Sequence, residues 1–146
     1  GIILAYAGLS RLGMTDIISE TIQEDIILPA VGQAALAIEI RSGDRHAEKI
    51  IAPLNDPESE LSIACERSFL SSLGGGCQVP IAGLARLTGN GLVIKGMVAS
   101  LDGREIYQGT VTGAASDYER TGRSLAHKLL EDGARNILEK IYGRSL

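Results

Sequence analysis

Aromatic side chains are scarce in this sequence, which has no Trp, one Phe and four Tyr among its 146 residues. The core must therefore be built mainly from Leu, Ile, Val and Ala. The net charge is −4, which argues against a general nucleic-acid-binding protein, because such proteins usually carry a basic stripe. We therefore expect no nucleic-acid partner, while a local basic site for a small anion stays open.

Cysteine and long apolar runs are scarce as well. Cys65 and Cys77 form no C-x-x-C pair, and neither has a His at metal-ligand spacing. This excludes a disulfide scaffold and a zinc site, so we expect no metal and a reducing cytoplasm. No apolar run approaches the roughly 20 residues that span a bilayer, and no secretory signal is visible, so we expect no membrane partner.

The first residues read GIILAYAGLSRLGM, with no initiating Met and no polar cap. Native N-termini are more often polar and frayed. We therefore interpret the chain as a piece of a longer protein.

The first 55 residues carry short helix and strand signals separated by breakers. Ala and Leu slightly favour a helix over a strand at residues 2–12, which lead to Gly13. Thr15 or Asp16 can cap a short helix. The elements expected from these signals are a helix at 2–12, a helix at 15–20, a linker at 28–33, a buried strand at 34–40 and a helix at 44–52.

The remaining residues predict the order helix, three strands, helix. Asp56 is a good N-cap, the glycine run 74–76 ends the first helix, and Ser116 with Glu119 forms a capping box for the last one. The expected bounds are a helix at 56–73, strands at 80–88, 92–101 and 104–112, and a helix at 117–142. Hairpin signals, GNG at 89–91 and DG at 102–103, separate the strands. The predicted fold class is α+β, with helices packed on one face of a three-stranded antiparallel sheet.

The most unusual stretch places three glycines before Cys77 and Pro80 soon after it. The glycines remove side-chain bulk, which suits attachment of a large group to the thiol. A helix C-terminus does not lower a thiol pKa, so a free, unreactive cysteine is the alternative interpretation. Cys65 faces inward as a small buried hydrophobe. Glu66 and Arg67 are interpreted as exposed helix charges or an ion pair.

Four segments resemble porphobilinogen deaminases (hydroxymethylbilane synthases) and occur in that family's order. They are LAYAGLSRLG at 4–13, LPAVGQ at 28–33, CERSFL at 65–70 and GGCQVPI at 75–81. The last is similar to the family's cofactor-attachment signature.

This resemblance implies a covalent dipyrromethane cofactor on Cys77, attached as a thioether to a methylene carbon of a porphobilinogen-derived azafulvene. Four further porphobilinogen molecules are then joined to this primer with loss of ammonia, and the linear tetrapyrrole is released by hydrolysis. A thioether suits a permanent tether because it does not exchange with thiols as a disulfide does.

The resemblance also implies roles for single residues. Arg11 matches a position expected to bind the carboxylates of the growing chain, a task for which the guanidinium fork is suited. Gly32 and Gln33 match the crossover near the cofactor, and Gly76 precedes the attachment cysteine. The family's catalytic aspartate lies upstream of this match, so no catalytic residue is expected in these 146 residues.

One departure concerns glycine. The family usually has GQGALG where this chain has GQAALA, so Ala34 and Ala37 replace glycines. If those positions need positive φ, the methyl groups disturb the backbone; otherwise alanine is harmless.

By the family pattern, residues 1–55 are an incomplete remnant of two N-terminal α/β domains, with 1–31 from the second domain and 32–54 from the first. Residues 56–146 are the C-terminal, cofactor-carrying domain. The expected parent is a monomer that needs its missing N-terminal part. Its compartment is the cytoplasm, or the plastid stroma if it comes from a plant or alga.

Two alternatives remain at this point. One is a small α+β binding or regulatory domain with an incidental free cysteine. The other is a thiol redox module, which lacks a resolving cysteine near Cys77.

Overall fold

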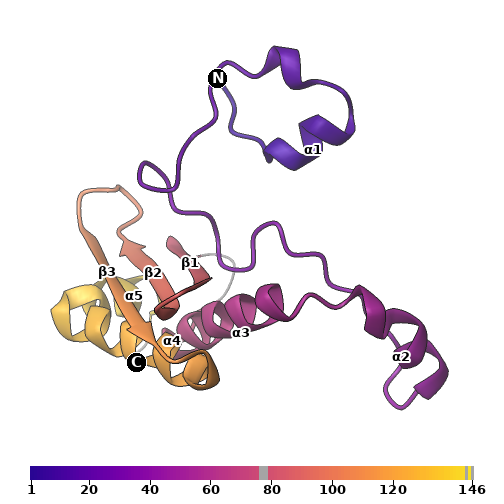
Figure 1. Cartoon of the computed structure of the whole chain (residues 1–146). Helices are drawn as coiled ribbons and strands as arrows, with labels where there is room; N and C mark the ends of the chain where they lie inside the picture. The colour runs from indigo at the N-terminus through magenta and orange to yellow at the C-terminus, as the bar shows by residue number, and fades with distance from the viewer. Residues whose placement is uncertain (76–78, 144, 146) are drawn as a thin grey trace.

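A computed structural model gives the fold and describes residues 1–75, 79–143 and 145 (Figure 1). Within these residues, a helical and sheet-containing C-terminal unit follows an extended N-terminal segment. The bounds are α1 Tyr6–Arg11, α2 Arg45–Ile51, α3 Pro57–Ser72, β1 Ile81–Thr88, β2 Gly91–Ala99, β3 Ile106–Gly113, α4 Tyr118–Leu129 and α5 Arg135–Tyr142.

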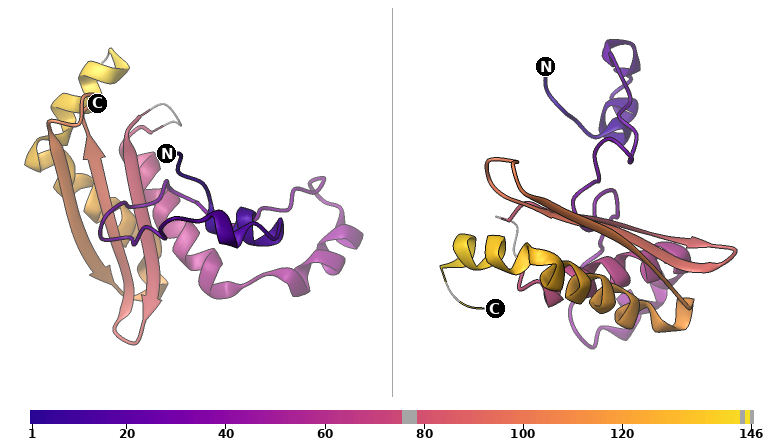
Figure 2. Two further views of the ribbon diagram at one scale, coloured as in Figure 1. Left: turned by 90° about the horizontal axis from the view of Figure 1, so that it is seen from above. Right: turned by 90° about the vertical axis from the view of Figure 1, so that its left-hand side faces the viewer.

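The strands β1, β2 and β3 form an antiparallel sheet in chain order. The helices α3, α4 and α5 lie on one face of this sheet, and the N-terminal segment lies toward the other face (Figure 2). The three predicted strands, their hairpin connections and the α+β class are therefore confirmed.

A row of three glycines crosses the inner face of the sheet, since Gly96 pairs with Gly83 on one side and Gly109 on the other. A Cβ at Gly96 would lie 2.7 Å from the ring of Phe69 and 2.9 Å from the side chain of Leu125. The bare backbone makes room for these two side chains, both fully buried. One Phe therefore lies in a core whose other fully buried side chains are mainly aliphatic.

The helices α3 and α4 approach each other closely at Gly122. A Cβ there would meet the backbone oxygen of Cys65 and would lie 2.9 Å from the backbone nitrogen of Phe69. The Ser68 hydroxyl donates to the Glu119 carbonyl at 2.8 Å across the same contact. Glycine thus lets two backbones pack without intervening side chains.

The predicted N-cap at Asp56 is confirmed, and Asp44, which was not predicted as a cap, caps α2 in the same way. The Asp56 carboxylate accepts from the Ser59 N–H at 2.7 Å and begins α3, and Asp44 does the same for Ala47 at 3.0 Å at the start of α2. The predicted capping box at Ser116 is wrong. A short 3₁₀ turn, Ala115–Asp117, precedes α4, and its N-cap Asp117 makes no side-chain capping hydrogen bond.

The single helix predicted for residues 117–142 is also wrong. A π-helical segment, Leu130–Ala134, separates α4 from α5, and Gly133 within it has φ 129° and ψ −8°. A Cβ at Gly133 would lie 2.6 Å from the ring of Tyr107 on β3. The chain therefore bends where a glycine accepts both an irregular backbone and a close aromatic neighbour.

In the N-terminal segment, α1 confirms the preference for a helix at residues 2–12, and a 3₁₀ turn, Thr15–Ile17, stands where a longer helix was predicted. The buried strand predicted at 34–40 is wrong. Leu36 and Ile38 are 90% and 54% exposed, and these residues form neither strand nor helix. A strand needs a neighbouring strand for its backbone groups, and the described residues offer none there.

None of the helices in the described residues is long and apolar enough to cross a membrane.

Candidate functional site

The helix α3 ends in a Schellman motif that leads directly into the glycine run. The Gly74 N–H donates to the Ser71 carbonyl at 3.0 Å, and the Gly75 N–H donates to the Leu70 carbonyl at 3.0 Å. Gly74 has φ +68°, and a Cβ at Gly75 would lie 2.9 Å from the Leu70 oxygen. Both glycines are therefore required for this helix end, as the sequence predicted.

The predicted attachment residue Cys77 and its neighbour Gly76 lie outside the described residues. On the far side of them, the chain is tied to the sheet. The Pro80 carbonyl accepts from the Ala99 N–H at 3.0 Å at the end of β2. Val79 packs against the core. The residues on both sides of 76–78, which we call the cysteine segment, are thus held in place, on α3 before it and on the sheet after it.

The segment predicted as a linker at 28–33 forms, with Ala34, a turn at residues 29–34 along the free edge of β1. The Gly83 N–H of β1 donates to the Pro29 carbonyl at 3.1 Å, and Val31 packs against the core. The turn is closed by a hydrogen bond from Gln33 N–H to the Ala30 carbonyl at 3.0 Å. The segment therefore covers part of a strand edge that would otherwise present unpaired backbone groups.

Left-handed backbone marks this turn twice. Gly32 has φ +76°, and Ala34 has φ +69°, the one positive φ among the described non-glycine residues. Ala34 is thus one of the two positions where the family usually has glycine, and it takes the conformation that favours glycine. Ala37 does not.

Glu66 joins this turn to the C-terminal unit. Glu66 belongs to α3, and the residue is only 2% exposed. One carboxylate oxygen accepts from the Ala85 N–H of β1 at 2.8 Å, and the other accepts from the Gly32 N–H at 2.7 Å. The interpretation of Glu66 as an exposed helix charge is therefore wrong. The position lies three residues before Phe69, on the border of the buried stripe.

Burial dominates the titration of this carboxyl. Desolvation raises the pKa of Glu66, while the hydrogen bonds from Ala85 and Gly32 act in the opposite direction. The neighbouring Cys65 is fully buried, as predicted, and burial together with the Glu66 charge raises the pKa of its thiol to about 11. Cys65 is therefore an unreactive core residue.

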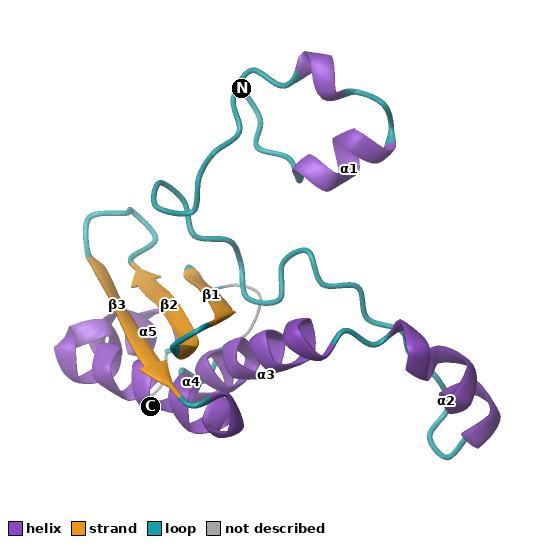
Figure 3. Ribbon diagram, in the orientation of Figure 1, coloured by secondary structure: helices purple, strands orange, loops and turns teal. Residues whose placement is uncertain are grey.

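Two other predicted residues lie at the surface. Arg11 is exposed on α1, which lies apart from α3 and the sheet (Figure 3), and no ion pair joins it to the residues that the structure describes. Gln33 is exposed in the turn. The structure thus brings Gly32 and Gln33 onto the C-terminal unit but leaves Arg11 away from it. No group of His, Cys, Asp and Glu in the described chain could hold a metal ion.

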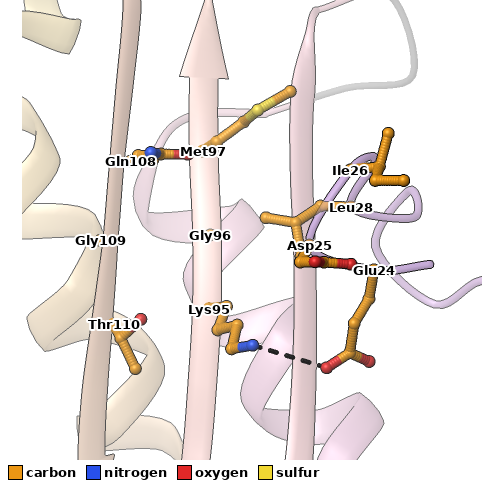
Figure 4. Close-up of a pocket in the computed structure, with 10 residues that line it drawn as sticks. All are labelled: Glu24, Asp25, Ile26, Leu28, Lys95, Gly96, Met97, Gln108, Gly109 and Thr110. Carbon is orange, nitrogen blue, oxygen red and sulfur yellow. Dashed lines mark hydrogen bonds and ion pairs between the residues drawn. The ribbon is translucent and has the colours of Figure 1, made fainter.

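A pocket of about 380 Å³ lies between residues 24–28 and the outer face of β2 and β3 (Figure 4). Glu24 forms ion pairs with Lys95, at 3.5 Å between the charged atoms, and with Arg86. These pairs hold the segment over the sheet, and none of the predicted site residues lines the pocket. No local pattern in the sequence pointed to this contact, because its partners lie more than 60 residues apart.

Known proteins match both parts of the chain. The family model "Porphobilinogen deaminase, dipyromethane cofactor binding domain" matches residues 1–49, and "Porphobilinogen deaminase, C-terminal domain" matches residues 61–131.

Three relatives are named porphobilinogen deaminase. The one from Moorella thermoacetica is 47% identical over 144 residues, which is 99% of this chain and 46% of the relative. Those from Roseiflexus castenholzii and a Nostoc species are 44% and 46% identical, covering 94% and 97% of this chain and 45% and 44% of the relatives. The chain thus spans about half the length of the relatives it matches. Sequence identity at this level over nearly all of the chain means that it belongs to the porphobilinogen deaminase family.

Proposed function

We propose that this chain is part of an enzyme that joins four porphobilinogen molecules, with loss of ammonia, into hydroxymethylbilane for tetrapyrrole synthesis. The observation that carries the proposal is the 47% identity to a porphobilinogen deaminase over 144 residues, which include the string GGCQVPI at 75–81. The substrate is porphobilinogen. The enzyme is a transferase, and its compartment is the cytoplasm, or the plastid stroma in a plant or alga.

The chain divides by role in this proposal. Residues 1–55 belong to the two N-terminal domains of the parent protein, and residues 56–146 form the C-terminal, cofactor-carrying domain. Exposed apolar side chains support this division, since Ile2, Leu36 and Leu54 are 84%, 90% and 69% exposed. Such surface is normally covered by another part of a protein. The partner is the remainder of the parent's own chain, and the parent is a monomer.

Cys77 is the residue that carries the covalent dipyrromethane, with Gly76 beside it. When bound, this group supplies the free pyrrole end at which the product grows. The absence of side chains on Gly74 and Gly75, directly before the segment, supports this role, because neither residue adds bulk beside the thiol. The fully buried Cys65, with its raised thiol pKa, is unsuited to the same task.

Arg11 binds carboxylates of the pyrrole units in this proposal. Each pyrrole carries acetate and propionate groups, and an exposed guanidinium forms paired, charge-assisted hydrogen bonds with carboxylates. Arg11 is exposed at the end of α1, where its side chain is accessible to such a ligand. Gly32 and Gln33 contribute backbone and side-chain contacts near the cofactor.

Cysteine replacement in the full-length parent tests the proposal. The Cys77→Ala protein is expected to form no hydroxymethylbilane from porphobilinogen, whereas Cys65→Ala is the matched control and keeps activity per folded molecule. Chain 1–146 alone is expected to form none, because the family's catalytic aspartate lies outside it. Normal bilane formation by the Cys77→Ala parent contradicts the proposal and favours a binding domain with an incidental thiol.

A further inference from the structure

The carboxylate of Glu66 connects three parts of the chain that are distant in sequence. It belongs to α3, and it accepts hydrogen bonds from Ala85 on β1 and from Gly32 in the turn at 29–34. The residues of these two bonds are 19 and 34 positions apart in sequence. Glu66 is therefore a long-range connector and takes no part in local capping of its helix.

The hydrogen bond from Gly32 to Glu66 holds one end of the turn at 29–34. The Gly32 N–H is available because φ +76° turns the backbone toward α3, where the carboxylate lies 2.7 Å away. The same turn is held at its other end by the bond from Gly83 to the Pro29 carbonyl at 3.1 Å. Without the carboxylate, the Pro29 bond and the packing of Val31 would still hold the start of the turn, but the Gly32 end would lose its anchor.

The same helix leads into the cysteine segment. From Glu66, α3 continues to Ser72 and passes directly into its Schellman end at Gly74 and Gly75. The helix is rigid along this stretch, since Phe69 and Leu73 are fully buried in the core. A shift of the Gly32 turn relative to α3 is therefore also a shift relative to the start of the cysteine segment.

We propose that Glu66 is a positioning residue that fixes the turn at 29–34, through Gly32, against α3, the helix that precedes Cys77. This inference rests on the proposed function for the role of Cys77, but the contact itself does not. Glu66 acts through the backbone of the turn and does not bind porphobilinogen. Its loss is therefore expected to slow the joining of pyrrole units without weakening substrate binding.

The test compares Glu66→Gln with the matched control Glu58→Gln in the full-length parent. Both changes remove one carboxylate from α3, but Glu58 is exposed in the first turn. A Gln side chain has one acceptor oxygen, so it keeps one of the two N–H partners and turns an NH₂ group toward the other. Glu66→Asp serves as a second variant, which keeps the charge but is too short to hold both partners.

Two readouts separate positioning from mere stability. In Glu66→Gln, kcat is expected to fall about tenfold with KM for porphobilinogen little changed, because misplacing a reacting group affects turnover more than binding. Amide exchange is expected to rise in residues 31–35 and to stay unchanged in β2. Glu66→Asp is expected to fall between wild type and Glu66→Gln in both readouts.

The inference is overturned if Glu66→Gln matches Glu58→Gln in kcat and in exchange at 31–35. It is equally overturned if exchange rises uniformly over β2 and the turn while kcat per folded molecule stays normal in both Glu66 variants, because the role is then structural only. Failure of the proposed function looks different, since the wild-type parent itself would then make no bilane.

Discussion

The buried carboxylate of Glu66 and the strained backbone of Ala34 act on the same turn, at residues 29–34. Glu66 holds the turn through Gly32, and Ala34 continues it with φ +69°. The left-handed conformation costs a residue with a Cβ about 1–2 kcal/mol. The turn is thus held in place against a local backbone cost.

Replacing Ala34 by Gly removes that cost. Glycine is more flexible in the unfolded chain, by about 0.5–1 kcal/mol, so the net gain is smaller than the strain itself. Amide exchange at residues 32–35 is expected to slow about threefold in Ala34→Gly. The control is Ala37→Gly, where φ is not positive and no slowing is expected. Equal slowing in both variants would show that the strain at Ala34 is unimportant.

The raised pKa of Glu66 makes the stability of the chain depend on pH. Because the pKa is higher in the folded chain than in the unfolded chain, the folded chain binds the proton more tightly. This contribution is fully present below the ordinary carboxyl pKa and is lost as the pH rises through the raised folded value. The fold therefore gains from protonation of this group.

Urea unfolding of chain 1–146 and of its Glu66→Gln variant over a pH series measures this effect. The free energy of unfolding of the wild type, minus that of the variant, is expected to increase as the pH falls from neutral toward the ordinary carboxyl range. Glu58→Gln, which removes an exposed carboxylate from the same helix, serves as the control. A difference that is flat, or that shrinks on acidification, contradicts the assignment of a raised pKa.

Among the elements, the interrupted C-terminal helix shows how one glycine sets the path of the chain. The irregular backbone at Gly133 lets α5 leave the direction of α4, and Tyr107 occupies the space that a side chain would need. The buried residues of α5, Ile137 and Leu138, reach the core after this bend.

Replacing Gly133 by Ala is expected to lower the free energy of unfolding by about 2 kcal/mol or more, since positive φ and overpacking against Tyr107 add. Gly103→Ala is the matched control, because Gly103 also has positive φ, at +69°, but has nothing within 4 Å of a Cβ. The control is expected to lose only about 1 kcal/mol, the backbone part. Equal losses in urea unfolding would show that the tyrosine contact contributes nothing.

Elements with local signals could be predicted from the sequence. Asp56 and the glycines at 74–75 bound α3, and the hairpin signals at 89–91 and 102–103 delimit the strands. The break at Gly133 could not be predicted, because the apolar stripe continues through it and its cause is a ring on β3. The strand predicted at 34–40 failed because apolar composition alone supplies no hydrogen-bonding neighbour.

In the candidate site, too, features with a local sequence signal could be predicted, and long-range contacts could not. Glycines 74 and 75 and the turn at 28–33 were recognisable from composition and motif. The burial of Glu66 was not, since its partners Gly32 and Ala85 are brought to it only by the fold. The ion pairs of Glu24 with Arg86 and Lys95 are likewise products of long-range packing.

At the scale of the whole molecule, a packed C-terminal unit carries an extended segment with much exposed apolar surface. The alignment with the Moorella relative includes 99% of this chain but only 46% of the relative. The two parts meet at the turn at 29–34, through Pro29, Val31 and Gly32, and at the ion pairs of Glu24 with the sheet. The proposed enzyme therefore depends on this junction and on the parts of the parent beyond these residues.

In the proposed enzyme, Cys77 carries the primer on which the tetrapyrrole is built. Peptide mapping by tandem mass spectrometry of the active parent, purified under reducing conditions, tests this attachment. We expect the peptide containing Cys77 to bear a dipyrromethane on sulfur that survives reduction, and the peptide containing Cys65 to be unmodified. Unmodified thiols at both positions, in protein that still makes hydroxymethylbilane, would show that Cys77 carries no primer.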